Sequence, residues 1–208
     1  MMRGPRLLAT AAALACAVAF VPDTAHAHLV DTRLGDFYSG ALHPLTDLQQ
    51  VLPWIALAVL AAFQGAQQAR WIILVFPLAL AIGGIASLAV PLPSFGPLLG
   101  LVLVAVTGLA VAAAARLPLG VLLAIAVVMG LLHGAQNGAA MVATTDRLLF
   151  LSGMTAVGYG VITLATGSAI AFLHGAPWRP IALRAGGSWV AAVGIMVLGL
   201  HLVRPVAG

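Results

Sequence analysis

The sequence predicts an all-α membrane protein: a polytopic bundle of about six transmembrane helices behind a cleaved N-terminal signal peptide. Two observations carry this prediction. Hydrophobic residues make up 62% of the 208 residues and charged residues only 7%, with no lysine or glutamate. Apolar stretches also run from Val51 to Val203, interrupted only by single arginines, prolines and short polar loops. Each stretch is close to the roughly 20 residues that a helix needs to cross a hydrocarbon core about 30 Å thick.

The N-terminus has the three parts of a secretory signal. Arg3 and Arg6 form a basic region, residues 7–21 are apolar, and Ala25-His26-Ala27 is a small-x-small cleavage site. Cleavage removes residues 1–27 and leaves His28 as the first residue, outside the cytoplasm, where its amine and imidazole can chelate a metal. A retained signal anchor is the alternative.

Six spans follow, which together form a single domain over residues 28–208. They are expected at 42–65, 71–90, 95–115, 119–143, 148–173 and 187–203. Pro91-Leu92-Pro93 ends the second span and Arg116-Leu117-Pro118 stops the third, because proline cannot continue a helix. Short connections make successive helices antiparallel neighbours.

The charged residues and the single cysteine indicate the topology of the chain and limit its possible partners and binding sites. Nine arginines and five aspartates give a formal charge of +4. The arginines lie at span ends, so they indicate topology and contact with anionic lipid, and nucleic acid is not expected as a partner. A translocated N-terminus in the bacterial inner membrane places Arg70, Arg116, Arg179 and Arg184 on the cytoplasmic side, and Arg33, Arg147 and Arg204 outside. The only cysteine, Cys16, lies in the signal, so the mature chain has no disulfide and no thiolate site.

Two similar tetrapeptides suggest an inverted repeat of three plus three spans. Gly40-Ala41-Leu42-His43 opens the first span and Gly130-Leu131-Leu132-His133 lies in the fourth. Because three spans separate the two copies, they would run in opposite directions, as in many transporters. Chance similarity in a chain rich in Ala, Gly and Leu is the alternative.

Polar residues in the first span are spaced to share one helix face. His43, Thr46, Asp47 and Gln50 stand at i, i+3, i+4 and i+7. Pro44 suits the first helical turn, and Pro53 should kink the helix by freeing the carbonyl of Gln49. Since an aspartate facing lipid is costly, this face should look into the bundle or toward outer water.

The fourth span has a second polar stripe, and the fifth a weaker one. The fourth carries Met129, His133, Gln136, Asn137, Ala140 and Thr144 at helical spacing, beside the small residues Gly130, Gly134, Gly138 and Ala139. The amides of Gln136 and Asn137 either join helices or belong to a functional site. Their clustering with His133 favours a functional site. The fifth carries Ser152, Thr155, Tyr159, Thr163 and Thr166, hydroxyl groups that can bond to their own helix.

The histidines are expected at different depths in the membrane. His43 and His133 are both expected toward the outer side, where they can meet. His174 and His201, near span ends, are expected to be interfacial.

His43-Pro44-Leu45-Thr46, followed by an apolar run, resembles the start of the HupE/UreJ hydrogenase and urease accessory membrane proteins. The resemblance implies a cleaved signal, about six spans, nickel or cobalt permease activity and a context of urease or hydrogenase maturation. That family has a first motif H-P-x-x-G-x-D-H and a second motif H-G-x-x-H-G-x-E. His43, Pro44, His133, Gly134 and Gly138 match these motifs. The chain departs at the other positions, with Asp47, Gln49 and Gln50 in the first motif and Asn137 and Ala140 in the second.

These residues lead to one principal hypothesis, a permease for Ni²⁺ or Co²⁺. His43, Asp47 and His133 would be ligands, with Gln50, Gln136 and Asn137 as support and His28 as a further donor, because imidazole and carboxylate bind these ions well. The ion is cargo, and no tightly bound cofactor is expected. The alternatives are an accessory protein that has lost its ligands and a haem-carrying subunit with two axial histidines. An enzyme is not expected, since the chain offers no nucleophile with a positioned base, paired carboxylates or nucleotide motif.

Overall fold

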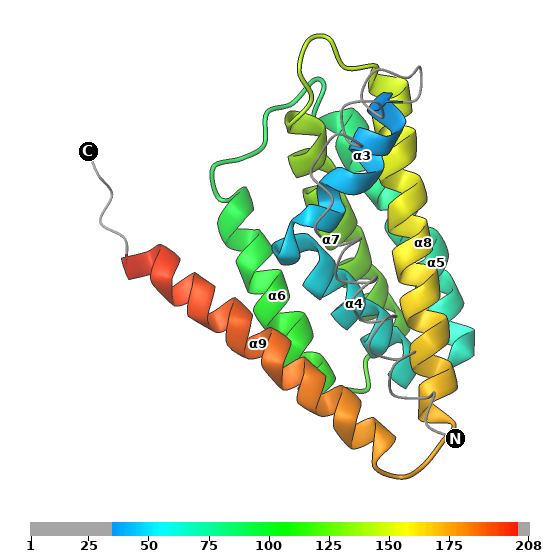
Figure 1. The fold of residues 1–208 in the computed structure, drawn as a ribbon. Coiled ribbons are helices and arrows are strands. Elements are labelled where there is room, and N and C mark those ends of the chain that lie inside the picture. The colour runs from blue at the N-terminus through cyan, green and yellow to red at the C-terminus, as the bar shows by residue number, and fades with distance from the viewer. Residues whose placement is uncertain (1–34, 204–208) are drawn as a thin grey trace, which may run out of the picture. The chain divides into compact units, whose positions relative to one another are not determined.

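The computed structural model describes residues 35–203, and every regular element in that range is a helix. The helices are α3 (Gly35–Thr46), α4 (Leu48–Phe63), α5 (Ala66–Ala86), α6 (Gly96–Ala112), α7 (Leu119–Ala139), α8 (Arg147–Leu173) and α9 (Arg179–Val203) (Figure 1). The predicted signal peptide with Cys16, the proposed donor His28, and the terminal arginines Arg33 and Arg204 lie outside the described residues.

Four of these helices, α5, α7, α8 and α9, are long and apolar enough to cross a membrane. Helices α3 and α4 qualify only as a pair, which is bent by 78°, and α6 is an apolar helix of 17 residues. The described part of the chain is therefore a helical membrane protein, as the sequence predicts. The number of spans and the inverted repeat remain predictions.

The prediction of one continuous helix over 42–65 is wrong, because the chain breaks at Asp47. This residue has extended backbone (φ −101°, ψ 105°) and is the N-cap of α4. Its Oδ1 accepts a hydrogen bond from the Gln49 backbone N–H at 2.8 Å, and its Oδ2 accepts one from Gln50 Nε2 at 3.3 Å. Such a side chain satisfies backbone donors that a starting helix leaves free. His43 and Gln50 therefore lie on different helices and cannot form a stripe on one face.

Other boundaries also differ from the predicted spans. Pro44 lies inside α3 and not in a first turn, because α3 already begins at Gly35. Helix α4 continues through Pro53, and the sharp bend lies at the aspartate that caps it. Helix α7 ends at Ala139, so Ala140 and Thr144 lie beyond the helical stripe to which the sequence pattern assigned them.

Helix α4 lies in the centre of the described bundle, in contact with α5 to α9 (Figure 1). Trp54, Leu57 and Leu60 on α4 have no exposed surface. By contrast, α9 runs diagonally along α6 and turns most of its side chains outward (Figure 1). A helix that is mostly shielded by its neighbours can carry polar side chains at lower cost, provided that they find partners.

Glycines set how closely two of the helix pairs approach. A Cβ on Gly134 of α7 would lie 2.0 Å from the carbonyl oxygen of Leu80 on α5, and one on Gly108 of α6 would lie 2.4 Å from the Ala191 backbone nitrogen on α9. No side chain fits at such distances, so both contacts are between backbones. Small residues commonly allow this approach between membrane helices.

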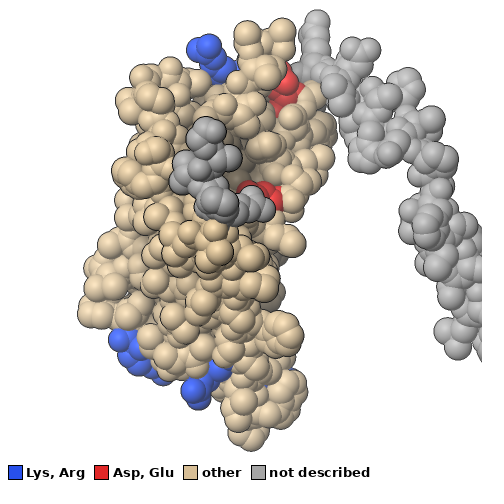
Figure 2. All heavy atoms as spheres, turned by 90° about the vertical axis from the view of Figure 1, so that its left-hand side faces the viewer, with Lys and Arg blue, Asp and Glu red and all other residues tan. Residues whose placement is uncertain are grey.

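Two arginines cap helix C-termini at the end of the bundle opposite the break at Asp47. Arg116 donates to the carbonyl of Phe63 at the end of α4, and Arg184 Nε donates to the carbonyl of Ala112 at the end of α6 (2.8 Å). On the face drawn in Figure 2, acidic side chains lie toward one end only, whereas basic side chains occur at both ends. Cations at helix C-termini satisfy free carbonyls and complement the helix dipole.

Candidate functional site

A polar cavity of about 300 Å³ lies at the break between α3 and α4. Its lining residues come from α3, the helix break, α4, α6 and α7: His43, Asp47, Gln49, Gln50, Pro97, Gly100, His133 and Gln136. Five of the seven predicted site residues thus line one cavity, although the predicted common helix face does not exist. Asn137, the sixth, lies beside the cavity and bonds to Gln50.

Two hydrogen bonds connect α4 and α7 beside this cavity. Asn137 Nδ2 donates to Gln50 Oε1 at 2.5 Å, and Trp54 Nε1 donates to His133 Nδ1 at 2.7 Å. Each helix contributes residues one turn apart, and the order of the pairs shows that the helices are antiparallel. All four side chains are buried, with exposed fractions of 5% or less. The sequence pattern therefore found three of the four partners and missed Trp54.

The Asp47 carboxylate is tied into the same network. Asn137 donates to Gln50, and Gln50 in turn donates to Asp47 Oδ2. Asn137 Nδ2 also donates to the carbonyl of His133 at 2.6 Å, while Asn137 Oδ1 is buried without a hydrogen-bond partner. Burying an oxygen without a hydrogen-bond donor costs free energy, which a bound water molecule or cation would offset.

His43 reaches the cavity from α3, which packs against α8. A Cβ on Gly40 would lie 2.0 Å from the carbonyl oxygen of Phe150, so the two backbones nearly touch. The ring of His43 lies 6.1 Å from the ring of Phe150, measured between centroids. His43 is exposed and Asp47 is half-buried, which leaves both accessible to an ion that enters the cavity.

The cavity is not a preformed coordination shell. Within residues 35–203, no group of three or more His, Cys, Asp or Glu side chains is placed to hold a metal ion. Two imidazoles and one carboxylate face the space, together with amide groups, which are weak ligands for Ni²⁺ and Co²⁺. This donor set fits an ion that keeps part of its water, and the cavity has room for several water molecules.

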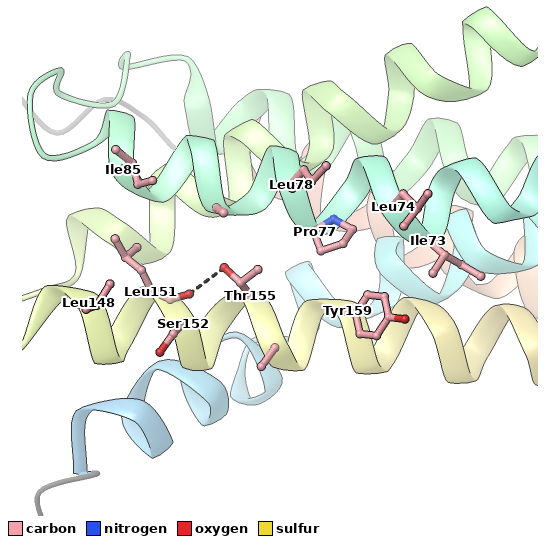
Figure 3. Close-up of a pocket in the computed structure, with 12 residues that line it drawn as sticks. Ile73, Leu74, Pro77, Leu78, Ile85, Leu148, Leu151, Ser152, Thr155 and Tyr159 are labelled. Atoms are coloured by element: carbon pink, nitrogen blue, oxygen red, sulfur yellow. Dashed lines mark hydrogen bonds between the residues drawn. The ribbon is translucent and has the colours of Figure 1, made fainter.

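A larger cavity of about 670 Å³ lies between α5 and α8, but its lining is almost entirely apolar (Figure 3). Ser152, Thr155 and Tyr159 of the predicted hydroxyl stripe line this groove. Ser152 donates to the carbonyl of Leu149 at 2.8 Å and Thr155 to that of Leu151 at 2.7 Å, so both bond to their own helix. The phenol of Tyr159 is the only titratable group among the residues that line the groove. The groove therefore has the chemistry of a lipid-facing surface and offers little to bind an ion. The smaller polar cavity is therefore the candidate site.

Two features of this region were not predicted, although the sequence carries a signal for each: the helix break at Asp47, and Trp54, which bonds to His133 beside the cavity. Asp47-x-x-Gln50 has the spacing of a capping box, which marks the start of a helix. Trp54 follows Gln50 by one turn and so continues its face. Pro97 and Gly100 come from α6, and no local pattern assigns them to the site. His174 and His201 lie near the C-terminal ends of α8 and α9 and do not line the cavity.

Comparison with known proteins identifies the family of the chain. A family model described as HupE / UreJ protein matches residues 14–197. The chain belongs to the HupE/UreJ family. No curated protein and no solved structure matches the chain significantly.

Membership makes this a membrane protein of an accessory or permease-like family connected with nickel and cobalt. The two stretches that resemble the HupE/UreJ motifs are 83 or more residues apart in sequence, from Gln50 to His133, and they meet at one cavity. Gln50 and Asn137 occupy the positions where the motifs have histidines, and these two amides bond directly to each other.

Proposed function

We propose that this HupE/UreJ protein is a permease for a divalent transition metal, Ni²⁺ or Co²⁺, in the bacterial inner membrane with its mature N-terminus outside the cytoplasm. The observation that carries the proposal is the polar cavity, which unites side chains from both motif regions. An ionisable or strongly polar cluster among membrane helices is expensive to bury, which favours a functional role over a packing role.

In this proposal His43 and Asp47 bind the ion directly. Imidazole and carboxylate are good ligands for Ni²⁺ and Co²⁺, and both groups are open to the cavity. Gln50 and Gln136 supply amide groups to the cavity, Asn137 supports Gln50, the imidazole of His133 lines the cavity, and His28 remains a further donor. Weak binding suits a permease, because the ion must leave again.

Replacement of Asp47 by asparagine tests the proposal. Asparagine caps a helix about as well as aspartate, so Asp47→Asn removes the charge but keeps the start of α4. We expect cell-associated Ni²⁺ or Co²⁺ to fall at least tenfold, with the protein still in the membrane. His43→Ala should have a similar effect.

Asp146 provides a matched control because it is the N-cap of α8, accepts from the Leu149 N–H at 3.1 Å and does not line the cavity. Asp146→Asn should leave uptake unchanged. Uptake that is the same in wild type, Asp47→Asn and His43→Ala would rule out the permease.

A second function, a membrane accessory protein without transport, is favoured by one observation. The described residues contain no three-ligand group, as expected if the ligands of an ancestral site were replaced by amides. Such a protein would act through partners in urease or hydrogenase maturation. Equilibrium dialysis of the purified protein distinguishes the two, since saturable Ni²⁺ or Co²⁺ binding supports the permease and its absence supports the accessory role.

A further inference from the structure

The hydrogen bond between Trp54 and His133 determines what His133 can offer to the cavity. Both side chains are buried, with exposed fractions of 0% and 1%, and the Nε1–Nδ1 distance is 2.7 Å. The indole also packs against the Phe76 ring of α5 in a T-shaped contact, with centroids 5.2 Å apart. Trp54 is thus fixed with its N–H directed at His133.

The chemistry of the two rings then assigns the proton of the imidazole. Indole Nε1–H only donates hydrogen bonds. Neutral imidazole has one donor nitrogen and one acceptor nitrogen, so the nitrogen that accepts from Trp54, Nδ1, carries no proton. The proton is therefore on Nε2, the nitrogen left for the cavity that His133 lines.

This arrangement is the reverse of that around a metal-binding histidine. Such a histidine usually donates its second N–H to a carboxylate, a carbonyl or water, which leaves a lone pair for the metal. In His133 the Nδ1 lone pair is taken by Trp54, and Nε2 carries a proton. For Nε2 to bind a metal, the proton would have to move to Nδ1, where it would face the indole N–H.

We propose that Trp54 is a positioning residue that keeps His133 out of the coordination sphere of the ion and makes it a hydrogen-bond donor to the cavity. This inference rests on the proposed transport of a divalent cation. It assigns direct binding to His43 and Asp47, while His133 donates from Nε2 to a water molecule on the ion or to another acceptor in the cavity. Holding the ion partly through its water keeps binding weak, as release requires.

The proton position can be measured on the unmodified chain. In ¹⁵N NMR of histidine-labelled, metal-free protein in detergent, the His133 signals are identified by their loss in His133→Gln. We expect a protonated Nε2 and an unprotonated Nδ1 in the wild type. A protonated Nδ1 in the wild type would overturn the proposal.

Metal affinity provides the second measurement. Trp54→Phe keeps an aromatic ring against Phe76 and removes the N–H, so His133 can become a ligand and Ni²⁺ should bind about tenfold more tightly in equilibrium dialysis. The double variant Trp54→Phe/His133→Gln should lose that gain. Trp189→Phe, at an α9 indole that is 77% exposed, is the matched control and should bind like the wild type.

Equal Ni²⁺ affinity in wild type and Trp54→Phe would overturn the coordination role of Trp54, even if His43→Ala abolishes binding and so upholds the permease. If no variant binds Ni²⁺ or Co²⁺, the proposed function fails instead. The NMR signals then still decide whether Trp54 sets the proton on His133, so the two failures can be told apart.

Discussion

Helix α7 has two faces that are built in opposite ways. One face carries Gly130, Gly134 and Gly138 and lies against the backbone of α5. The other face carries His133, Gln136 and Asn137 and lies toward α4 and the polar cavity. The glycine face has no side chains to contribute, and the polar face is bonded through side chains alone.

The difference indicates what each face is for. Close backbone contact through glycine is enough to join two membrane helices, as α6 and α9 also show with Gly108 and Gly194. Helix α7 therefore has an apolar means of association and does not need histidine, glutamine and asparagine merely to stay in the bundle. Those residues are better explained by the cavity that they border.

The largest effect is expected from a methyl group on the glycine face. Gly134→Ala would place a Cβ 2.0 Å from the Leu80 carbonyl oxygen, which is backbone and cannot move aside alone. Overpacking of this kind costs about 3 kcal/mol or more, so the variant should lose much of its folded population after heating in detergent, measured by size-exclusion chromatography.

Gly160 on α8 is the matched control, because a Cβ there would meet nothing within 4 Å. Gly160→Ala should be neutral or stabilising by up to about 1 kcal/mol, since alanine favours a helix over glycine. Equal stability of the two alanine variants would show that α5 and α7 are not in backbone contact.

A smaller effect is expected from breaking one bond on the polar face. Asn137→Leu removes the donor to Gln50 Oε1 and leaves a buried acceptor alone, which costs about 1–3 kcal/mol. Gln50→Leu should also destabilise the protein. The double variant should recover part of the loss, with a coupling of about 0.6–1.7 kcal/mol in a double-mutant cycle of unfolding in detergent. Strict additivity would mean that the two amides do not interact.

The smallest effect is expected on the hydroxyl stripe of α8. Thr155 bonds to the carbonyl of Leu151 on its own helix and borders the apolar groove between α5 and α8 (Figure 3). Thr155→Val should therefore change the free energy of unfolding by less than about 0.5 kcal/mol and leave metal uptake as it is. A loss of uptake in this variant would place the ion path along α8 instead of the polar cavity.

Much of the candidate site could be predicted from single stripes of polar residues. His133, Gln136 and Asn137 lie close together on one helix, so their spacing alone placed them on one face. The error at Asp47 has a physical cause: apolar residues continue on both sides of it, so the hydrophobic pattern does not show the break. The capping pattern from Asp47 to Gln50 does show it, and it outweighs periodicity because a helix start needs its free N–H groups satisfied.

By itself, the sequence determined the helical membrane class, most of the helix positions and the polar residues that needed partners, because hydrophobic length and periodicity are local properties of the chain. Only the tertiary structure decided that α3 and α4 meet at a 78° bend, that a cavity forms there, and that Trp54 donates to His133, 79 residues away. The physical reason is that a hydrogen bond between distant helices depends on how closely the helices pack. Here, that packing brings the α4 and α7 residues within bonding distance, which no local pattern records.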